Sequence, residues 1–182
     1  MTTHTAKMGG MAVHLEVTSP RYGAELDALL AGFQPDWGGL TDRHHVIRLT
    51  TSRGEGYTPM TPYSQGGLPA LSYRPESGDY QAMGACYGLR IQSDPTRTLL
   101  HIEDRGLSDM ALKPVTKTVL RYGIAVVASH HNGVLIHGCA MVPPGGGSAY
   151  LFVGQSGAGK TTMRSRLAGW TALGDDTVLV RL

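Results

Sequence analysis

The sequence predicts an α/β protein in which an N-terminal α+β region, to about Leu107, precedes a core built around a glycine-rich loop. Two observations carry this prediction. Strand-like and helix-like apolar patterns alternate along the chain, and the apolar run 149–153 leads directly into the glycine loop. With 182 residues, of which 41% are apolar and 16% charged, the chain is globular in composition. Its length suits one domain, or a small domain with part of a second.

The first fifty residues are predicted to form a strand, a helix and a second strand. Residues 1–11 are polar and contain no apolar run, so they are not a signal peptide, and we expect an untethered tail. Residues 12–17 alternate as a strand does. Pro20 then opens a helix over 21–33, and 45–49 form the next strand.

The segment from Thr51 to Gly78 is rich in Gly, Pro, Ser and Thr, which favours loops and turns over packed elements. Strand patterns return at 86–91 and 98–102. A helix follows over 108–131, with Ser108 as its N-cap. The Asn132-Gly133 pair is predicted to end this helix, because Gly is the usual residue in the left-handed conformation that stops a helix.

The C-terminal core, residues 108–182 including that helix, is predicted to contain a β-hairpin that feeds the glycine loop. Residues 134–137 form a short apolar strand, and the turn 143–147 separates Met141-Val142 from the apolar run 149–153. A helix over 160–167 and a strand over 177–182 complete the predicted elements.

Charge and cysteine content exclude several classes of function. A formal net charge of +2 is too small to indicate nucleic-acid or membrane binding. No stretch reaches the roughly 20 apolar residues of a membrane span. Neither Cys86 nor Cys139 lies in a zinc or redox motif, so we expect two reduced thiols in a cytoplasmic protein. Homo-oligomerisation stays open.

The glycine loop matches the pattern G-x-x-x-x-G-K-[ST] of a Walker A phosphate-binding loop in full. Its glycines allow backbone amides to face phosphate oxygens, and the loop opens a helix whose first amides are unpaired. Lys160 would contact the β- and γ-phosphates, and the Thr161 hydroxyl would bind Mg²⁺. The pattern therefore predicts binding of a nucleoside triphosphate, ATP with Mg²⁺, by Gly154, Gln155, Ser156, Gly157, Ala158, Gly159, Lys160, Thr161 and Thr162. The alternative is a simple glycine turn with a solvated lysine.

Three further residues are candidates for the same site. Asp175 and Asp176 follow the loop by about fifteen residues, and a phosphate-binding site of this kind needs a carboxylate near the metal and another near the nucleophile. Two adjacent acids on an extended backbone would point in opposite directions. His137 ends the strand expected to pair with the one that feeds the loop, where it could bind a phosphate or transfer a proton. A structural histidine is an equal alternative.

Together these residues resemble the catalytic core of the HPr kinase/phosphorylase family, which is akin to phosphoenolpyruvate carboxykinase. The resemblance covers 133–182 and is carried by Gly133-Val134-Leu135-Ile136-His137-Gly138-Cys139-Ala140, Leu151 to Thr162, and Gly174-Asp175-Asp176. It implies an ATP-dependent kinase that phosphorylates a serine of a peptide or carrier protein, as the family's small members from peptide-modification gene cassettes are thought to do.

The resemblance also assigns roles to individual residues. Asp175 would accept the proton of the substrate hydroxyl, Asp176 and Thr161 would bind Mg²⁺, and His137 would lie at the phosphates. Family members continue beyond the strand that follows the two aspartates, so the resemblance implies a core that is incomplete at Leu182. Two alternatives remain: another P-loop ATPase, such as a transporter-type nucleotide-binding domain, and a non-catalytic nucleotide-binding module.

Overall fold

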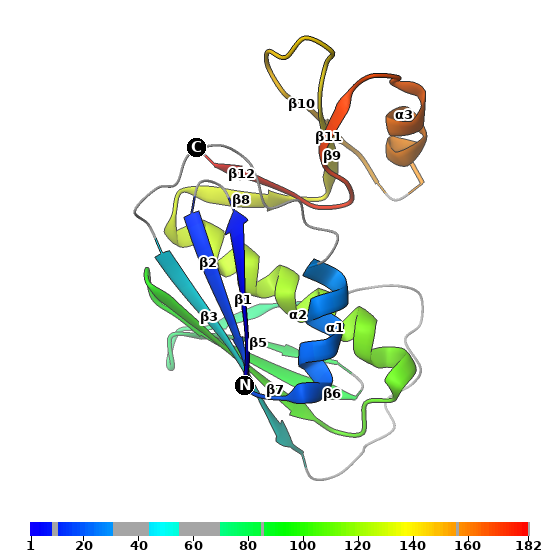
Figure 1. Ribbon diagram of the computed structural model, residues 1–182. Helices are drawn as coiled ribbons and strands as arrows, with labels where there is room; N and C mark the ends of the chain where they lie inside the picture. The colour runs from blue at the N-terminus through cyan, green and yellow to red at the C-terminus, as the bar shows by residue number, and fades with distance from the viewer. Residues whose placement is uncertain (9–10, 31–43, 55–69, 85, 156, 182) are drawn as a thin grey trace. The chain divides into compact units, whose positions relative to one another are not determined.

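The computed structural model describes residues 1–8, 11–30, 44–54, 70–84, 86–155 and 157–181, which form two compact units. Unit 1 spans Met1–His130 and unit 2 spans His131–Leu182. The chain has mixed α/β content, with one large mixed sheet and a few helices (Figure 1). No helix in these ranges is long and apolar enough to cross a membrane.

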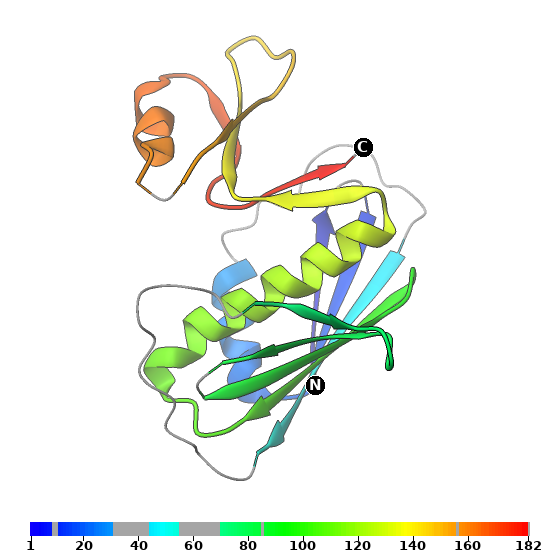
Figure 2. The same cartoon turned by 180° about the vertical axis from the view of Figure 1, so that it is seen from behind.

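Unit 1 is a seven-stranded sheet with two helices on one face (Figures 1 and 2). The strand order is β1-β2-β3-β7-β6-β5-β4, in which β2, β3 and β7 run parallel and the other pairs are antiparallel. Its elements are β1 (Thr2–Met8), β2 (Met11–Val17), α1 (Pro20–Leu30), β3 (His44–Arg53), β4 (Ser72–Arg74), β5 (Asp79–Met83), β6 (Tyr87–Ser93), β7 (Arg97–Asp104) and α2 (Asp109–His130).

The core of unit 1 lies between the helices and the parallel strands. Strand alternation directs one face of each strand inward, as in β2, where Val13, Leu15 and Val17 are each 1% exposed. Ile47 of β3 and Ile102 of β7 are fully buried on the same side. The opposite face carries polar side chains, which include the stacked ring pair of His14 and His44. An amphipathic sheet of this kind is stable because only one face needs a covering layer.

The structure corrects the expectation of an untethered N-terminal tail. Residues 2–8 form β1, which pairs with β2 along its whole length, from Thr2 opposite Val17 to Met8 opposite Met11. The sequence of β1 has no apolar face that would have predicted a strand. Its strand conformation is stabilised by pairing with β2, which the local sequence pattern does not reveal.

The segment predicted as a loop over 51–78 is partly strand. β3 continues through Arg53, β4 occupies Ser72–Arg74, and residues 55–69 lie outside the described residues. The end of the first predicted helix, 31–33, also lies outside them, whereas α1 begins at Pro20 as expected.

The long helix α2 matches its predicted bounds within a residue. The Ala111 amide donates to the Ser108 hydroxyl at 3.3 Å, and Asn132 takes the left-handed conformation with φ 54° just after the helix. The helix packs against α1, β6 and β7, so it is part of unit 1, although the sequence had grouped it with the C-terminal core.

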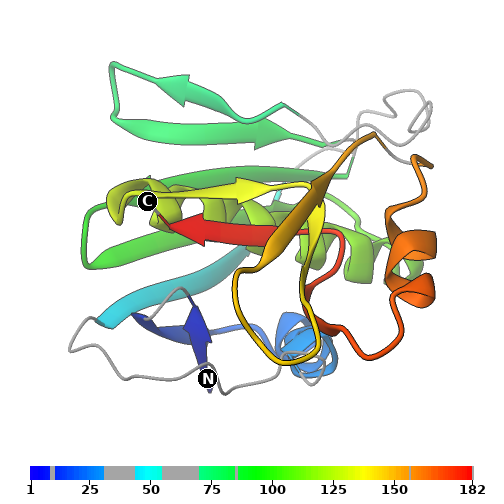
Figure 3. The same cartoon turned by 90° about the horizontal axis from the view of Figure 1, so that it is seen from above.

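Unit 2 consists of two small sheets and one helix. The first sheet has the order β10-β9-β11, and the second pairs β12 with β8. Figure 3 shows the arrows of β8 and β12 running in opposite directions. The elements are β8 (Gly133–Ile136), β9 (Gly138–Val142), β10 (Tyr150–Val153), α3 (Lys160–Arg166), β11 (Thr171–Gly174) and β12 (Val178–Arg181).

The predicted hairpin is confirmed, but its first strand is β9. Tyr150 of β10 pairs with Met141, and Val153 pairs with Gly138. The upstream strand β8 pairs instead with β12. The prediction that His137 ends the strand beside β10 is therefore wrong, since this residue joins β8 to β9.

A buried carboxylate in unit 1 should make stability depend on pH. The Asp79 side chain is fully buried, and hydrogen bonds from Ser77 and Arg90 hold its pKa below its usual range. A depressed folded-state pKa adds stability above the unfolded value of about 3.9, and that stability is lost as the pH falls through the folded value.

We therefore expect Asp79→Asn to flatten the loss of stability below about pH 4, measured by chemical denaturation at several pH values. Glu76→Gln, at a side chain that is 66% exposed, is the matched control and should keep the parent profile. An unchanged slope in the Asp79 variant would contradict the assignment.

Candidate functional site

The glycine-rich motif joins β10 to α3 in unit 2. β10 ends at Val153, the loop starts at Gly154, and α3 begins at Lys160. Gly157 and Gly159 have φ angles of 84° and 87°, in the left-handed region that residues with a side chain rarely adopt. The glycines of the motif are thus needed for the turn that leads the chain from strand into helix. Ser156 of the motif lies outside the described residues.

The side chain of Lys160 folds back over this loop. Its Nζ donates to the carbonyl oxygens of Gly154 at 2.7 Å and Gln155 at 2.9 Å. The Ala158 amide also donates to the Gln155 oxygen, at 3.1 Å, which closes a tight turn inside the loop. An ammonium group has three donors, so two bonds to the loop leave one donor for a ligand.

Strand pairing brings the predicted site residues to one edge of the first sheet. β10 and β11 pair with opposite sides of β9, and both run antiparallel to it. They are therefore parallel to each other, and their carboxyl ends lie at the edge where β9 begins. The loop follows β10, Asp175 follows β11 and His137 precedes β9, so all three meet at this edge.

The two aspartates lie in a bend, and not on the extended backbone that the sequence suggested. Gly174 ends β11, β12 starts at Val178, and Asp176 has a left-handed φ of 75°. Such a φ is uncommon outside glycine, although Asp tolerates it better than most residues.

Asp175 is exposed and pairs with α3, whereas Asp176 faces the β8–β9 junction. Arg164 Nη1 donates to Asp175 Oδ2 at 2.8 Å. Asp176 Oδ1 lies 3.3 Å from His137 Nδ1. The bend thus separates the acid pair into one carboxylate beside the helix of the loop and one beside the histidine.

Thr161 and Thr162 lie in the first turn of α3, where both are exposed. Within the described residues, no group of three or more His, Cys, Asp or Glu side chains is arranged to hold a metal ion. Among the described residues, the oxygen donors of this region include the hydroxyls of Thr161 and Thr162 and the two carboxylates.

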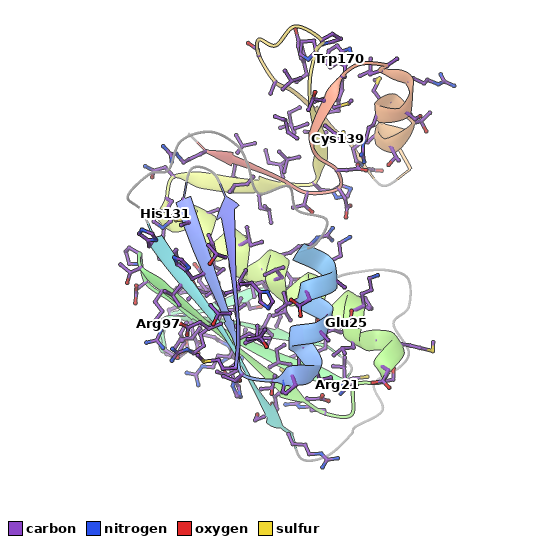
Figure 4. All side chains as sticks on the ribbon, in the orientation of Figure 1. Arg21, Glu25, Arg97, His131, Cys139 and Trp170 are labelled. Atoms are coloured by element: carbon purple, nitrogen blue, oxygen red, sulfur yellow. The ribbon has the colours of Figure 1, made fainter. Side chains whose placement is uncertain are left out.

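Arg164 was not among the site residues predicted from the sequence, whereas Cys139 was expected only as a reduced thiol. Arg164 lies four residues after Lys160, which places both on one face of α3 and could have indicated a partner for an acid. Cys139 lies on β9, where Figure 4 labels it, and it is fully buried. Burial together with the charge of Asp175 raises the pKa of its thiol. No local pattern distinguishes this cysteine from any other apolar strand residue.

The chain matches no protein-family model, no curated protein and no solved structure.

The two free cysteines should differ in reactivity, because only Cys139 is fully buried. We expect its thiol to react with Ellman's reagent at least about tenfold more slowly than that of half-buried Cys86, since reaction requires an accessible thiolate. Cys86→Ser and Cys139→Ser, each leaving one thiol, separate the two rates. Equal rates would show that the sheet around β9 opens freely.

Proposed function

We propose that the chain binds ATP with Mg²⁺ through residues 154–162 and transfers the γ-phosphoryl group to a serine of a peptide or carrier protein. One observation carries the proposal. A complete Walker A motif, with Lys160 held over its own loop, lies at the same sheet edge as Asp175 and His137. Phosphoryl transfer needs this combination of a phosphate-binding loop and a nearby carboxylate.

The loop would bind the triphosphate chiefly by electrostatics. Its glycines allow the amides to turn toward phosphate oxygens, and Lys160 adds a full positive charge close to those amides. The bonds from Nζ to the Gly154 and Gln155 oxygens hold the ammonium in place before the nucleotide arrives. This preorganisation lowers the cost of binding, because a long flexible side chain need not be ordered at that moment.

The donor set fits a hard divalent cation. The Thr161 hydroxyl and the Asp176 carboxylate are oxygen ligands of the kind that Mg²⁺ prefers, and nucleotide phosphates complete such sites. Bound there, Mg²⁺ would neutralise negative charge on the phosphates. Binding of Mg²⁺ by Asp176 would then weaken the contact between its carboxylate and His137.

Asp175 is the better placed carboxylate for the acceptor. Arg164 binds only its Oδ2 within the described residues, which leaves Oδ1 for the hydroxyl of an incoming serine. The Arg164 guanidinium also fixes the rotamer of this carboxylate. A positioned carboxylate of this kind orients the nucleophile and accepts its proton as transfer proceeds.

The similarity of 133–182 to the HPr kinase/phosphorylase core supports the choice of a serine acceptor. That similarity depends on the run ending in His137, the loop and the acid pair. Each of these segments borders the same edge of the β10-β9-β11 sheet.

Removal of the lysine should abolish nucleotide binding. We expect Mg²⁺ and ATP at about a hundred times the dissociation constant to stabilise the parent by roughly 2.7 kcal/mol, measured by thermal denaturation. Lys160→Ala should lose most of this stabilisation, while Lys113→Ala, at an exposed position of α2, should retain it. Equal stabilisation of all three proteins would exclude the loop as the nucleotide site.

Loss of the acid should separate binding from transfer. Asp175→Asn should keep the ATP-dependent stabilisation but lower the rate of phosphoryl transfer by about 10²- to 10⁴-fold, because the variant cannot accept the proton of the acceptor hydroxyl. Radiolabelled ATP with serine-containing peptides measures the rate. Transfer at the parent rate would refute the role of Asp175, and binding without transfer in the parent would favour a non-catalytic module.

A further inference from the structure

A second candidate site lies wholly within unit 1, at the carboxyl ends of its parallel strands. A pocket of about 480 Å³ opens where β2 leads into α1 and where β3 and β7 end. Its lining includes Ser19, Thr51, Arg53 and Asp104. Ligands of open α/β sheets bind in this position, because the loops that follow parallel strands diverge there.

The start of α1 supplies amides that the helix does not use. The Gly23 amide donates to the Ser19 oxygen at 3.0 Å, which is the first bond of the helix. The amides of Arg21 and Tyr22 precede that bond, and both residues line the pocket. At 11 residues, α1 is long enough for its positive end to favour an anion.

An unpartnered buried hydroxyl is the second, independent sign of a ligand. Tyr22 is 1% exposed, and its hydroxyl has no hydrogen-bond partner within the described part of the chain. Tyr22 is one of the residues that line the pocket, in keeping with the tendency of helical side chains to lean toward the helix N-terminus. Burial and the carboxylate of Asp104 raise the pKa of Tyr22 to about 12, so the hydroxyl is a donor at neutral pH. A buried donor without a partner costs stability unless a ligand accepts a hydrogen bond from it.

The charges around the pocket favour an anion. Arg21 is occupied, since it donates to Asp104, to Asp109 and to the Leu107 oxygen. Asp104 is paired with Arg21 and accepts hydrogen bonds from the amides of Gly106 and Leu107. Arg53, which pairs in register with Asp104, has no ion pair within the described residues. Its guanidinium is therefore the cation left for a ligand.

We propose that this pocket binds a phosphate group, either free or as the monoester of a small molecule, through Arg53, the first amides of α1 and the Tyr22 hydroxyl. A tetrahedral phosphate has several acceptor oxygens that point in different directions, so it can accept hydrogen bonds from an arginine, backbone amides and a tyrosine hydroxyl at the same time. The volume exceeds that of a phosphate, so the remainder of a small ester also fits. All the residues that line this pocket belong to unit 1.

The experiment uses the full chain carrying Lys160→Ala, which removes the phosphate-binding lysine of unit 2. Inorganic phosphate, glycerol 3-phosphate and acetate are titrated by calorimetry and by amide NMR. We expect both phosphates to bind and to shift the amide signals of Arg21 and Tyr22. Tighter binding of the ester would identify an ester as the source, equal binding would identify free phosphate, and equally tight binding of acetate would overturn the assignment to phosphate.

Variants in the same background test the named donors. Arg53→Ala should weaken phosphate binding by about tenfold, because a charge-assisted contact is lost. Arg97→Ala is the matched control, since Arg97 is exposed at the start of β7, and Figure 4 shows Arg97 and Arg21 at opposite ends of the sheet. This control should change the affinity by less than about twofold.

Tyr22→Phe separates a ligand-binding role from a structural one. It keeps the buried ring and removes only the unpartnered hydroxyl, so the ligand-free protein should be at least as stable as its parent. Phosphate binding should nevertheless weaken about threefold or more. Absence of phosphate binding, or unchanged affinity in both the Arg53 and Tyr22 variants, would overturn the proposal.

Discussion

The pairing of β10 and β11 with the two sides of β9 is the constraint on which the proposed nucleotide site depends. Because both outer strands run antiparallel to β9, their carboxyl ends must lie at the same sheet edge. That geometry brings the glycine loop within reach of a residue about fifteen positions further along the chain. Without it, the motif and the acid pair would be two unrelated segments.

Two bends complete this edge. His137 joins β8 to β9, and Asp175-Asp176 lies between β11 and β12. The chain therefore crosses between the two small sheets twice, and the two crossings lie side by side. The left-handed conformation of Asp176 directs its carboxylate to His137, while Asp175 stays beside Arg164.

Unit 1 uses the same physical rule in a different sheet. Its parallel strands β2, β3 and β7 end together, and the helix that follows β2 begins at their carboxyl ends. Here the polar groups come from separate segments: an arginine at the end of β3, a tyrosine on α1 and an aspartate at the end of β7. No short motif spans them, which is why sequence reasoning found no site in the N-terminal half.

Several helices and strands could be predicted from the sequence alone, because the pattern that specifies each of them lies within the segment itself. Apolar spacing predicted α2, alternation predicted β2, and the glycine pattern predicted a turn between β10 and α3, because the 3.6- and 2-residue periods and the steric freedom of glycine act within a few residues. Four other features became evident only from the folded structure. β1 is a strand, β8 pairs with β12, α2 belongs to unit 1, and Arg164 forms an ion pair with Asp175. Each of these depends on a partner distant in sequence, and the energy of strand pairing and packing comes from that partner more than from the segment itself.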